Sequence, residues 1–136
     1  MADRTVIKER LLTGLGSIPD FLTRAEEALK PLGFSKEESF KIKLALEEAL
    51  TNAMRHGNKL KTELFVDVAI FVDASGLVLE VKDQGQGFVV DRLPDPTTKE
   101  NKDRPCGRGV YLMKSLMDEV EFLDGGSKVR MVKYLS

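Results

Sequence analysis

Residues 35–57 read SKEESFKIKLALEEALTNAMRHG, and their pattern predicts one long amphipathic helix. Ser35, followed three residues later by Glu38, is a capping box, which is typical of a helix start. Apolar side chains then recur every three or four residues, as a helix with one buried face requires. This stripe consists of Ile42, Leu46, Ala49, Leu50 and Ala53. Gly57-Asn58 has the composition of a C-cap and predicts where the helix ends.

A strand and a shorter helix are predicted before this long helix. Apolar and β-branched positions over 5–12 favour a strand. Ser17 then has the place of an N-cap, with Pro19 in the first turn of the helix that follows. Pro31 and Gly33 end that helix.

Two hairpins and one more helix are predicted after it. Apolar side chains share one face at period two over 64–73, and 77–83 returns as a second strand after a short turn, which is typical of a hairpin. Helical spacing follows over 107–117, and residues 119–123 and 129–135 form two closing strands. The order predicts an α+β fold, a two-layer sandwich in which a mixed, mostly antiparallel sheet carries its helices on one face. The polar, proline-containing segment 89–108 is expected to be a lid or binding loop.

Composition narrows the class of protein. The 136 residues fit a single domain over 1–136, and the net charge of −1 gives no basic field for direct nucleic-acid binding. No apolar run is long enough to span a membrane, and the first residues lack a signal-peptide pattern, so we expect a cytoplasmic protein. Cys106 and His56 are the only residues of their types, which excludes an internal disulfide and multi-histidine zinc sites.

Glu48 and Asn52 are the first candidates for chemistry. They lie one helical turn apart, so both side chains share one face at the border of the apolar stripe. A carboxylate at the edge of a core can act as a general base, and an amide oxygen is a hard ligand suited to Mg²⁺. Taken alone, the pair also fits an ordinary solvated helix flank.

Asp83 ends the second strand of the first hairpin and has the same parity as the apolar positions 77, 79 and 81. The sequence therefore predicts a carboxylate on the core side, which must accept hydrogen bonds to be stable there. An adenine amino group could donate such a bond. Gly85 and Gly87, just before Phe88, would let the backbone approach a flat base or a phosphate. The same residues, taken alone, are also common in turns.

Gly107-Arg108-Gly109 precedes the predicted third helix. A glycine-rich turn at a helix start presents free N–H groups and the positive end of the helix dipole to an anion. A flexible hinge is the alternative for this segment. Neither glycine pair extends to G-x-G-x-x-G, and no G-x-x-x-x-G-K-[ST] occurs, which argues against a dinucleotide fold or a P-loop.

In this order, the three segments resemble the N, G1 and G2 boxes of the GHKL ATP-binding superfamily, whose shared architecture is the Bergerat fold. Glu48-x-x-x-Asn52 resembles the N box, Asp83-x-Gly85-x-Gly87-Phe88 the G1 box, and Gly107-Arg108-Gly109-Val110 the G2 box. The small size, Leu93-Pro94-Asp95-Pro96 and the stretch 116–120 resemble the bacterial anti-sigma-factor serine kinases. The resemblance covers nearly the whole chain.

The resemblance implies ATP and Mg²⁺ as cofactors and a role for each motif. Glu48 would orient or deprotonate the attacking hydroxyl, and Asn52 would bind the Mg²⁺ that bridges the phosphates. Asp83 would bond the adenine amino group. The glycines and Phe88 of the G1 box would shape the pocket. The G2 residues Gly107, Arg108, Gly109 and Val110 would contact the phosphates.

The resemblance also implies partners: a sigma factor that is held off RNA polymerase, an anti-sigma antagonist of the STAS type that is phosphorylated on serine, and a second copy in a homodimer. One segment departs from the family pattern, because Gly126-Ser127-Lys128 stands where the family usually has Gly-Thr and another small hydroxyl residue. For this reason Ser127 is not counted among the predicted site residues.

Two other functions stay open at the level of sequence. A non-catalytic module could use ATP only to set its affinity for a partner, since the same residues would bind the nucleotide. A detached histidine-kinase catalytic domain is the other reading, although the chain lacks a helical phosphoacceptor segment.

Overall fold

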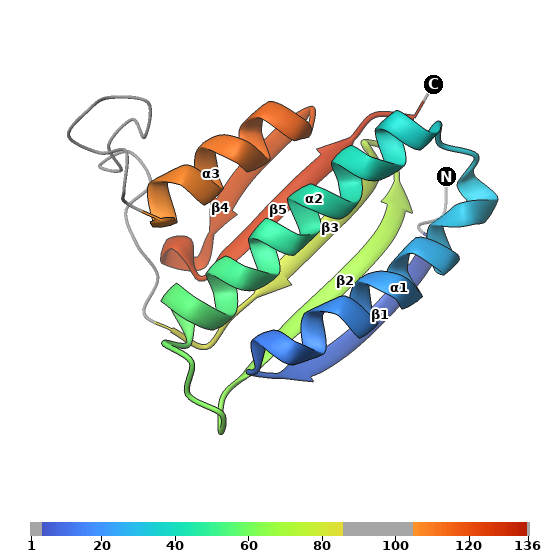
Figure 1. Cartoon of the computed structure of the whole chain (residues 1–136). Coiled ribbons are helices and arrows are strands. Elements are labelled where there is room, and N and C mark those ends of the chain that lie inside the picture. Colours follow the sequence, from blue (N-terminus) through green and yellow to red (C-terminus); the bar gives the residue numbers. More distant parts are fainter. Residues whose placement is uncertain (1–3, 86–104, 136) are drawn as a thin grey trace.

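The computed structural model describes residues 4–85 and 105–135, which form one sheet with helices packed on one of its faces (Figure 1). The β-strands in these ranges are β1 (Arg4–Leu12), β2 (Phe65–Asp73), β3 (Gly76–Lys82), β4 (Glu119–Leu123) and β5 (Lys128–Lys133). The α-helices are α1 (Ile18–Leu29), α2 (Lys36–Asn52) and α3 (Pro105–Leu116). Short helical turns cover Leu15–Ser17, Lys30–Leu32, Ala53–Gly57 and Asp124–Gly126.

The sheet has the strand order β1-β2-β3-β5-β4, and each of its described pairings is antiparallel. The hairpin β2–β3 supplies the centre, and β5 returns beside β3, so that Val81 lies opposite Val129. All three α-helices cover the same face (Figure 1). The α+β sandwich predicted from the sequence is therefore confirmed.

The hydrophobic core lies between the helices and this face of the sheet. The predicted stripe of α2 is buried in full, together with alternating residues of β2 and β3. These residues are Ile42, Leu46, Ala49, Leu50 and Ala53 from the helical stretch, and Val66, Val68, Ile70, Leu77, Leu79 and Val81 from the strands. One point was not predicted: Val78 and Val132, on the helix-free face, are also buried. They lie opposite each other, near the ion pairs that Arg130 makes with Asp73 (3.3 Å) and Glu80 (3.8 Å).

The start of α2 is as predicted. The Ser35 Oγ accepts a bond from the Glu38 N–H (3.1 Å), and the Glu38 carboxylate accepts the Ser35 N–H in return (3.4 Å). At α1, Ser17 does have the N-cap position, but its hydroxyl donates to the Gly14 carbonyl (2.7 Å) instead of capping the helix. The α1 end also fits, because a short turn containing Pro31 leads to Gly33 at φ 73°.

The end of α2 differs from the prediction. The helix does not close with a left-handed cap at Gly57-Asn58. It passes into a π-helical turn over Ala53–Gly57, closed by the Asn58 N–H bonding to the Ala53 carbonyl (2.8 Å). Left-handed backbone occurs only afterwards, at Lys59 (φ 52°) and Leu60 (φ 59°). Such π-helical turns are rare and often lie at functional sites.

The predicted lid, 89–108, lies mostly outside the described residues. Its last four residues belong instead to the first turn of α3, which begins at Pro105. No helix in the two described ranges has the length and apolar character needed to cross a membrane.

Candidate functional site

Helix α2 places Glu48 and Asn52 one turn apart, and both are half-buried. Their neighbours Ala49 and Ala53 face the core, which holds this part of the helix against the sheet. Burial raises the pKa of Glu48, and repulsion from Glu47 raises it further. The carboxylate is therefore a stronger base than a solvated glutamate would be.

Asp83 follows directly after β3 and is 8% exposed, as the parity of the strand predicts. Its backbone N–H donates to the Ser127 carbonyl (2.9 Å), and its Oδ1 accepts the Gly85 N–H (2.7 Å). Burial raises the pKa of Asp83, while the Gly85 bond and the charge of Lys82 oppose that rise. The second carboxylate oxygen has no bond within the described residues and is free to accept one from a ligand.

Two glycines let the end of α2 lie directly against Asp83. A Cβ added at Gly57 would overlap the Asp83 carboxyl group, and a Cβ at Gly85 would overlap the Gly57 carbonyl oxygen. Neither glycine has a positive φ, so close approach is what requires glycine here. The end of the N-box helix is thus packed directly against the Asp83 carboxyl group and the backbone of the G1 segment.

A third glycine brings α3 to Asn52. A Cβ at Gly109 would lie 3.2 Å from the Asn52 Nδ2, tighter than ordinary van der Waals contact. Gly109 itself is buried. The G2 segment therefore meets the N-box amide in the second turn of α3, one turn after the free N–H groups at the helix start that favour an anion.

A cavity of about 20 Å³ joins the predicted residues. Its lining is Ala49, Asn52, Ala53, Gly57, Val81, Asp83, Met113, Phe122, Gly126, Ser127 and Val129. Asn52 and Asp83 supply polar groups, and most of the other walls are apolar or small. The volume suits about one water molecule, so a purine ring requires the walls to move apart. Glu48 lies one turn before Asn52, outside this lining.

The donor set fits a nucleotide-bound Mg²⁺ better than a protein-only metal site. No group of three or more His, Cys, Asp or Glu within 4–85 and 105–135 is placed to hold a metal ion. Mg²⁺ usually takes one or two protein oxygens and completes its shell with water and phosphate. The Asn52 amide oxygen, beside the close approach of Gly109, is suited to that role.

The structure brings together part of the predicted set. Asn52, Asp83, Gly85 and Gly109 converge on one region, as the preceding contacts show, and Glu48 lies one helical turn before Asn52. Val110 has its side chain in the hydrophobic core, so only its backbone could meet a ligand. Gly107 and Arg108 lie in the first turn of α3, but the Arg108 side chain is outside the described part of the chain, as are Gly87 and Phe88.

Sequence reasoning missed Ser127 as a site residue. Ser127 is 9% exposed, lines the cavity, and its carbonyl holds the Asp83 backbone. Its hydroxyl donates to the Asp124 carbonyl (3.0 Å). The Gly125-Gly126 turn before it was a usable signal, because a glycine pair allows the chain to come back close to β3. From the sequence, Ser127 stands out only as part of a departure from the family pattern.

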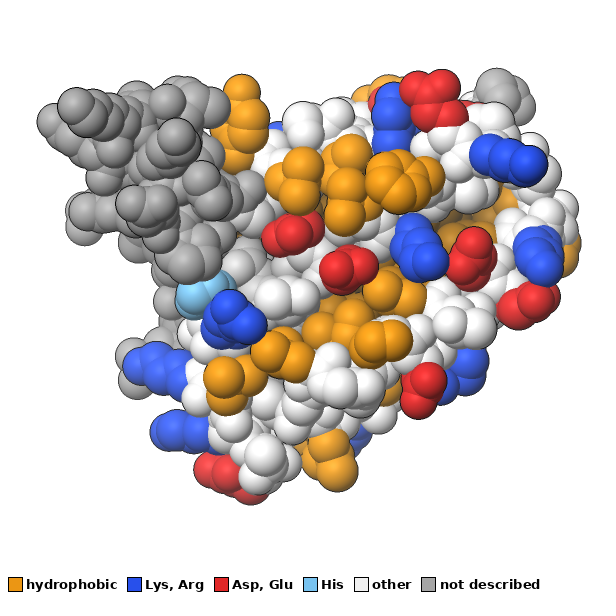
Figure 2. Space-filling model, in the orientation of Figure 1, with side chains coloured by type: hydrophobic (Ala, Val, Ile, Leu, Met, Phe, Trp, Pro, Cys, Tyr) orange, Lys and Arg blue, Asp and Glu red, His pale blue; other side chains and the backbone are white. Residues whose placement is uncertain are grey.

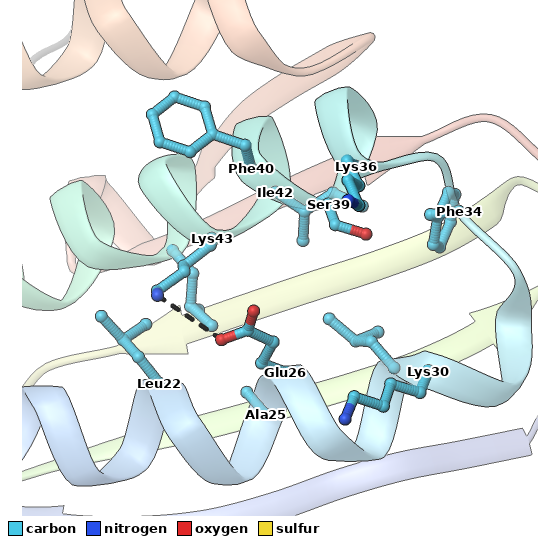
Figure 3. A pocket seen from close by; sticks show the side chains of 12 residues that line it. Leu22, Ala25, Glu26, Lys30, Phe34, Lys36, Ser39, Phe40, Ile42 and Lys43 are labelled. Atoms are coloured by element: carbon cyan, nitrogen blue, oxygen red, sulfur yellow. Dashed lines mark ion pairs between the residues drawn. The ribbon is translucent and has the colours of Figure 1, made fainter.

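A larger groove, about 500 Å³, lies between α1 and α2 (Figure 3). Its walls include Leu22, Phe34 and Ile42, and the Glu26–Lys43 ion pair (3.4 Å) crosses it. Figure 2 shows apolar side chains gathered over this seam between the helices. None of the three motifs lines the groove, so size alone does not identify the candidate site.

Comparison with known proteins agrees with this geometry. Residues 14–133 match the family described as the histidine kinase-like ATPase domain. The chain is also similar to proteins named anti-sigma F factor from Bacillus cytotoxicus, Bacillus cereus and Bacillus thuringiensis. Each is 35% identical over 106 residues, which is 74% of this chain and 72% of the relative.

Proposed function

Because the chain belongs to the histidine kinase-like ATPase domain family, we propose that it binds ATP and transfers the γ-phosphate to a serine of a partner protein. The convergence of Asn52, Asp83 and Gly109 at one place carries this proposal. Three segments far apart in the chain bring a metal-type ligand, a buried hydrogen-bond acceptor and a helix start together. Phosphoryl transfer depends mainly on such positioning and on charge neutralisation.

Asp83 would recognise the base. The adenine amino group is a donor, and the free oxygen of the Asp83 carboxylate is the acceptor it needs. Val81, Met113 and Val129 offer apolar walls on which a flat ring can stack once the cavity widens. Gly85, Gly87 and Phe88 would complete the base pocket.

The phosphates would lie between α2 and the start of α3. Mg²⁺ held by Asn52 would neutralise phosphate charge there. Asn52 would orient the triphosphate. Gly107 and Arg108, in the first turn of α3, would contact it through free N–H groups and the arginine charge, and Gly109 and Val110 in the next turn would complete this side of the site. The close packing of Gly109 against Asn52 supports this placement.

Glu48 would orient the serine hydroxyl and accept its proton. The hydroxyl oxygen then forms its bond to the γ-phosphorus while the bond to the β-phosphate oxygen breaks, leaving ADP. The raised pKa of Glu48 supports this role, because a carboxylate with a higher pKa is a stronger base.

The relatives' name supports a sigma factor as the bound partner. We further propose that the phosphorylated partner is a STAS-type anti-sigma antagonist, that the protein acts as a homodimer, and that it works in the cytoplasm. Co-elution with each candidate partner, with and without Mg²⁺ and ATP, tests the partners, the molar mass of the protein alone in solution tests the homodimer, and cell fractionation tests the location.

Transfer of radiolabelled phosphate from ATP to a STAS antagonist at pH 8 tests the enzyme function. Glu48→Gln should lower the rate by roughly 10²–10⁴-fold while ATP affinity changes less than about twofold. Glu47→Gln, one residue away and exposed, is the matched control and should keep the wild-type rate. ATP binding without any transfer by the wild type would instead indicate a non-catalytic regulatory module.

A further inference from the structure

Asn58, immediately after the π-helical turn, is the most completely buried of the polar residues in the described part of the chain, at 1% exposed. Asn58 is neither part of the Glu48–Asn52 pair nor among the residues that line the cavity. A buried amide is costly unless its donors and acceptor are all satisfied. The bonds it makes therefore show what the fold uses it for.

The Asn58 side chain joins three segments. Its Oδ1 accepts the Gln84 N–H (2.8 Å), and its Nδ2 donates to the Phe65 carbonyl (3.0 Å) and to the Thr13 Oγ1 (2.9 Å). The Thr13 hydroxyl in turn donates to the Leu64 carbonyl (2.9 Å), so its oxygen is available as an acceptor. This network fixes which end of the amide is oxygen, because a backbone N–H must meet an acceptor.

Gln84 is the residue next to Asp83, and it is anchored twice. Besides the Asn58 bond to its N–H, its side-chain Oε1 accepts the Phe65 N–H (2.8 Å). Three successive N–H groups are thus committed: Asp83 to Ser127, Gln84 to Asn58 and Gly85 to the Asp83 carboxylate. Of these three bonds, only the one to Asn58 connects the segment to the end of the helix that carries the N box.

We propose that Asn58 is a positioning residue: by holding Gln84 it fixes the Asp83 carboxylate against Gly57, in the place where it selects adenine. The use of this position for adenine rests on the proposed function. Only an amide meets all three partners, because aspartate lacks the two donors and a small hydroxyl residue lacks the reach and the second donor. The effect on the ligand passes through Asp83, and Asn58 itself touches no ligand.

Thr13 offers a matched control within the same network. Thr13→Val keeps the shape of the side chain but removes the hydroxyl, so Asn58 loses a partner on the β1 side and keeps its bond to Gln84. Asn58→Ala removes all three bonds of the side chain. A purely structural role predicts that each variant alters the nucleotide site only in proportion to the stability it loses. A positioning role predicts that Asn58→Ala alters the site beyond its loss of stability and that Thr13→Val does not.

The first measurement is amide hydrogen exchange by NMR in the nucleotide-free protein. In Asn58→Ala the protection of the Gln84 and Gly85 amides should fall at least tenfold more than that of Leu79, in the middle of β3. In Thr13→Val these amides should follow Leu79. Unchanged relative protection at Gln84 in Asn58→Ala, or the same selective loss in Thr13→Val, would overturn the proposal.

The second measurement is calorimetric titration with ADP and GDP, at a temperature where circular dichroism shows each variant folded. Asn58→Ala should reduce the preference for ADP at least tenfold, and Thr13→Val should leave it within twofold. Equal preferences in the two variants contradict the inference. If the wild type binds neither nucleotide, the proposed function fails, while the exchange experiment still decides the role of Asn58.

If Asn58→Ala does not fold, Asn58→Asp takes its place. It keeps an acceptor for the Gln84 N–H and loses both donors, so stability should fall while the protection of Gln84 relative to Leu79 is retained. Selective loss of that protection in Asn58→Asp would count against the proposal.

Discussion

The Asp83 carboxylate lies where burial makes its charge unfavourable. Burial raises its pKa above the ordinary 3.8, so the folded protein binds this proton more tightly than the unfolded chain. The contribution of Asp83 to stability therefore falls as the pH rises from about 3.8 through the raised value. Because its buried charge lowers the free energy of unfolding, Asp83 is better explained by a role in ligand binding than by a role in folding.

The change Asp83→Asn separates these two roles. Without nucleotide, the variant should be at least as stable as the wild type at pH 7. The fall in unfolding free energy that the wild type shows as the pH rises through the Asp83 pKa should be absent. ATP affinity should fall by about 1–3 kcal/mol, because the amide can present a mismatched donor to adenine. Urea unfolding between pH 3 and 8 and calorimetric titration measure the two effects. Unchanged ATP affinity would remove Asp83 from the base pocket.

Burial and the neighbouring Glu47 both raise the pKa of Glu48 and so make its carboxylate a stronger base. Since Glu47 adds to the raised pKa of Glu48, Glu47→Gln should lower that pKa and shift the acid limb of the transfer rate to lower pH. On the plateau above the acid limb, the rates of the two proteins should agree. Single-turnover rates between pH 4.5 and 8 measure the shift. An acid limb that stays in place would mean that another group controls it.

At the scale of elements, the π-helical turn carries the end of α2 into contact with the G1 segment. Alanine at a helical position usually stabilises by about 1 kcal/mol relative to glycine. Gly57→Ala should do the opposite, because its Cβ would overlap the Asp83 carboxyl group. We expect a loss of about 1–3 kcal/mol in unfolding free energy and weaker ATP binding.

Gly16→Ala is the control for that change, because a Cβ there meets nothing within 4 Å and its φ is not left-handed. Thermal unfolding should show that variant at or slightly above wild-type stability. If Gly57→Ala is equally harmless, the close approach of α2 to Asp83 is not needed for the fold.

Elements set by local chemistry were predictable from the sequence. The capping box at Ser35 and the parity that buries Asp83 depend on neighbouring residues, and the structure confirms both. The π-helical turn was not predictable, because the packing of Gly57 against Asp83 joins segments far apart in the chain. The Asn58 network has the same origin: its partners come from β1, β2 and the end of β3, and no local pattern encodes them.

The same distinction applies to the site. The spacing of Glu48 and Asn52 on one helix face and the burial of Asp83 follow from local periodicity, and the structure brings Asn52 and Asp83 to one cavity. Ser127 reaches the cavity only because β5 pairs with β3 and returns the chain to the Asp83 backbone. The small volume of the cavity is likewise a property of packed side chains, which spacing alone does not give.

At the scale of the whole molecule, the cavity is lined by residues from both described parts of the chain. Its walls come from α2 and β3 before residue 86, and from α3, β4 and β5 after residue 104. A ligand seated there contacts only the folded chain, because unfolding separates these walls. Nucleotide binding should therefore be measurable as stability of the entire fold.

Mg²⁺ and ATP at 100 times the dissociation constant should stabilise the wild type by about 2.7 kcal/mol. For a chain of this length that corresponds to an increase in Tm of roughly 10 °C. At the same ligand concentrations Asn52→Ala should gain less, because it lacks the proposed magnesium ligand. Ser35→Ala, at the opposite end of α2, should lose about 1 kcal/mol through its missing cap and still show the full gain from ligand. Differential scanning calorimetry distinguishes these cases, and equal gains in Asn52→Ala and Ser35→Ala would show that Asn52 takes no part in holding the nucleotide.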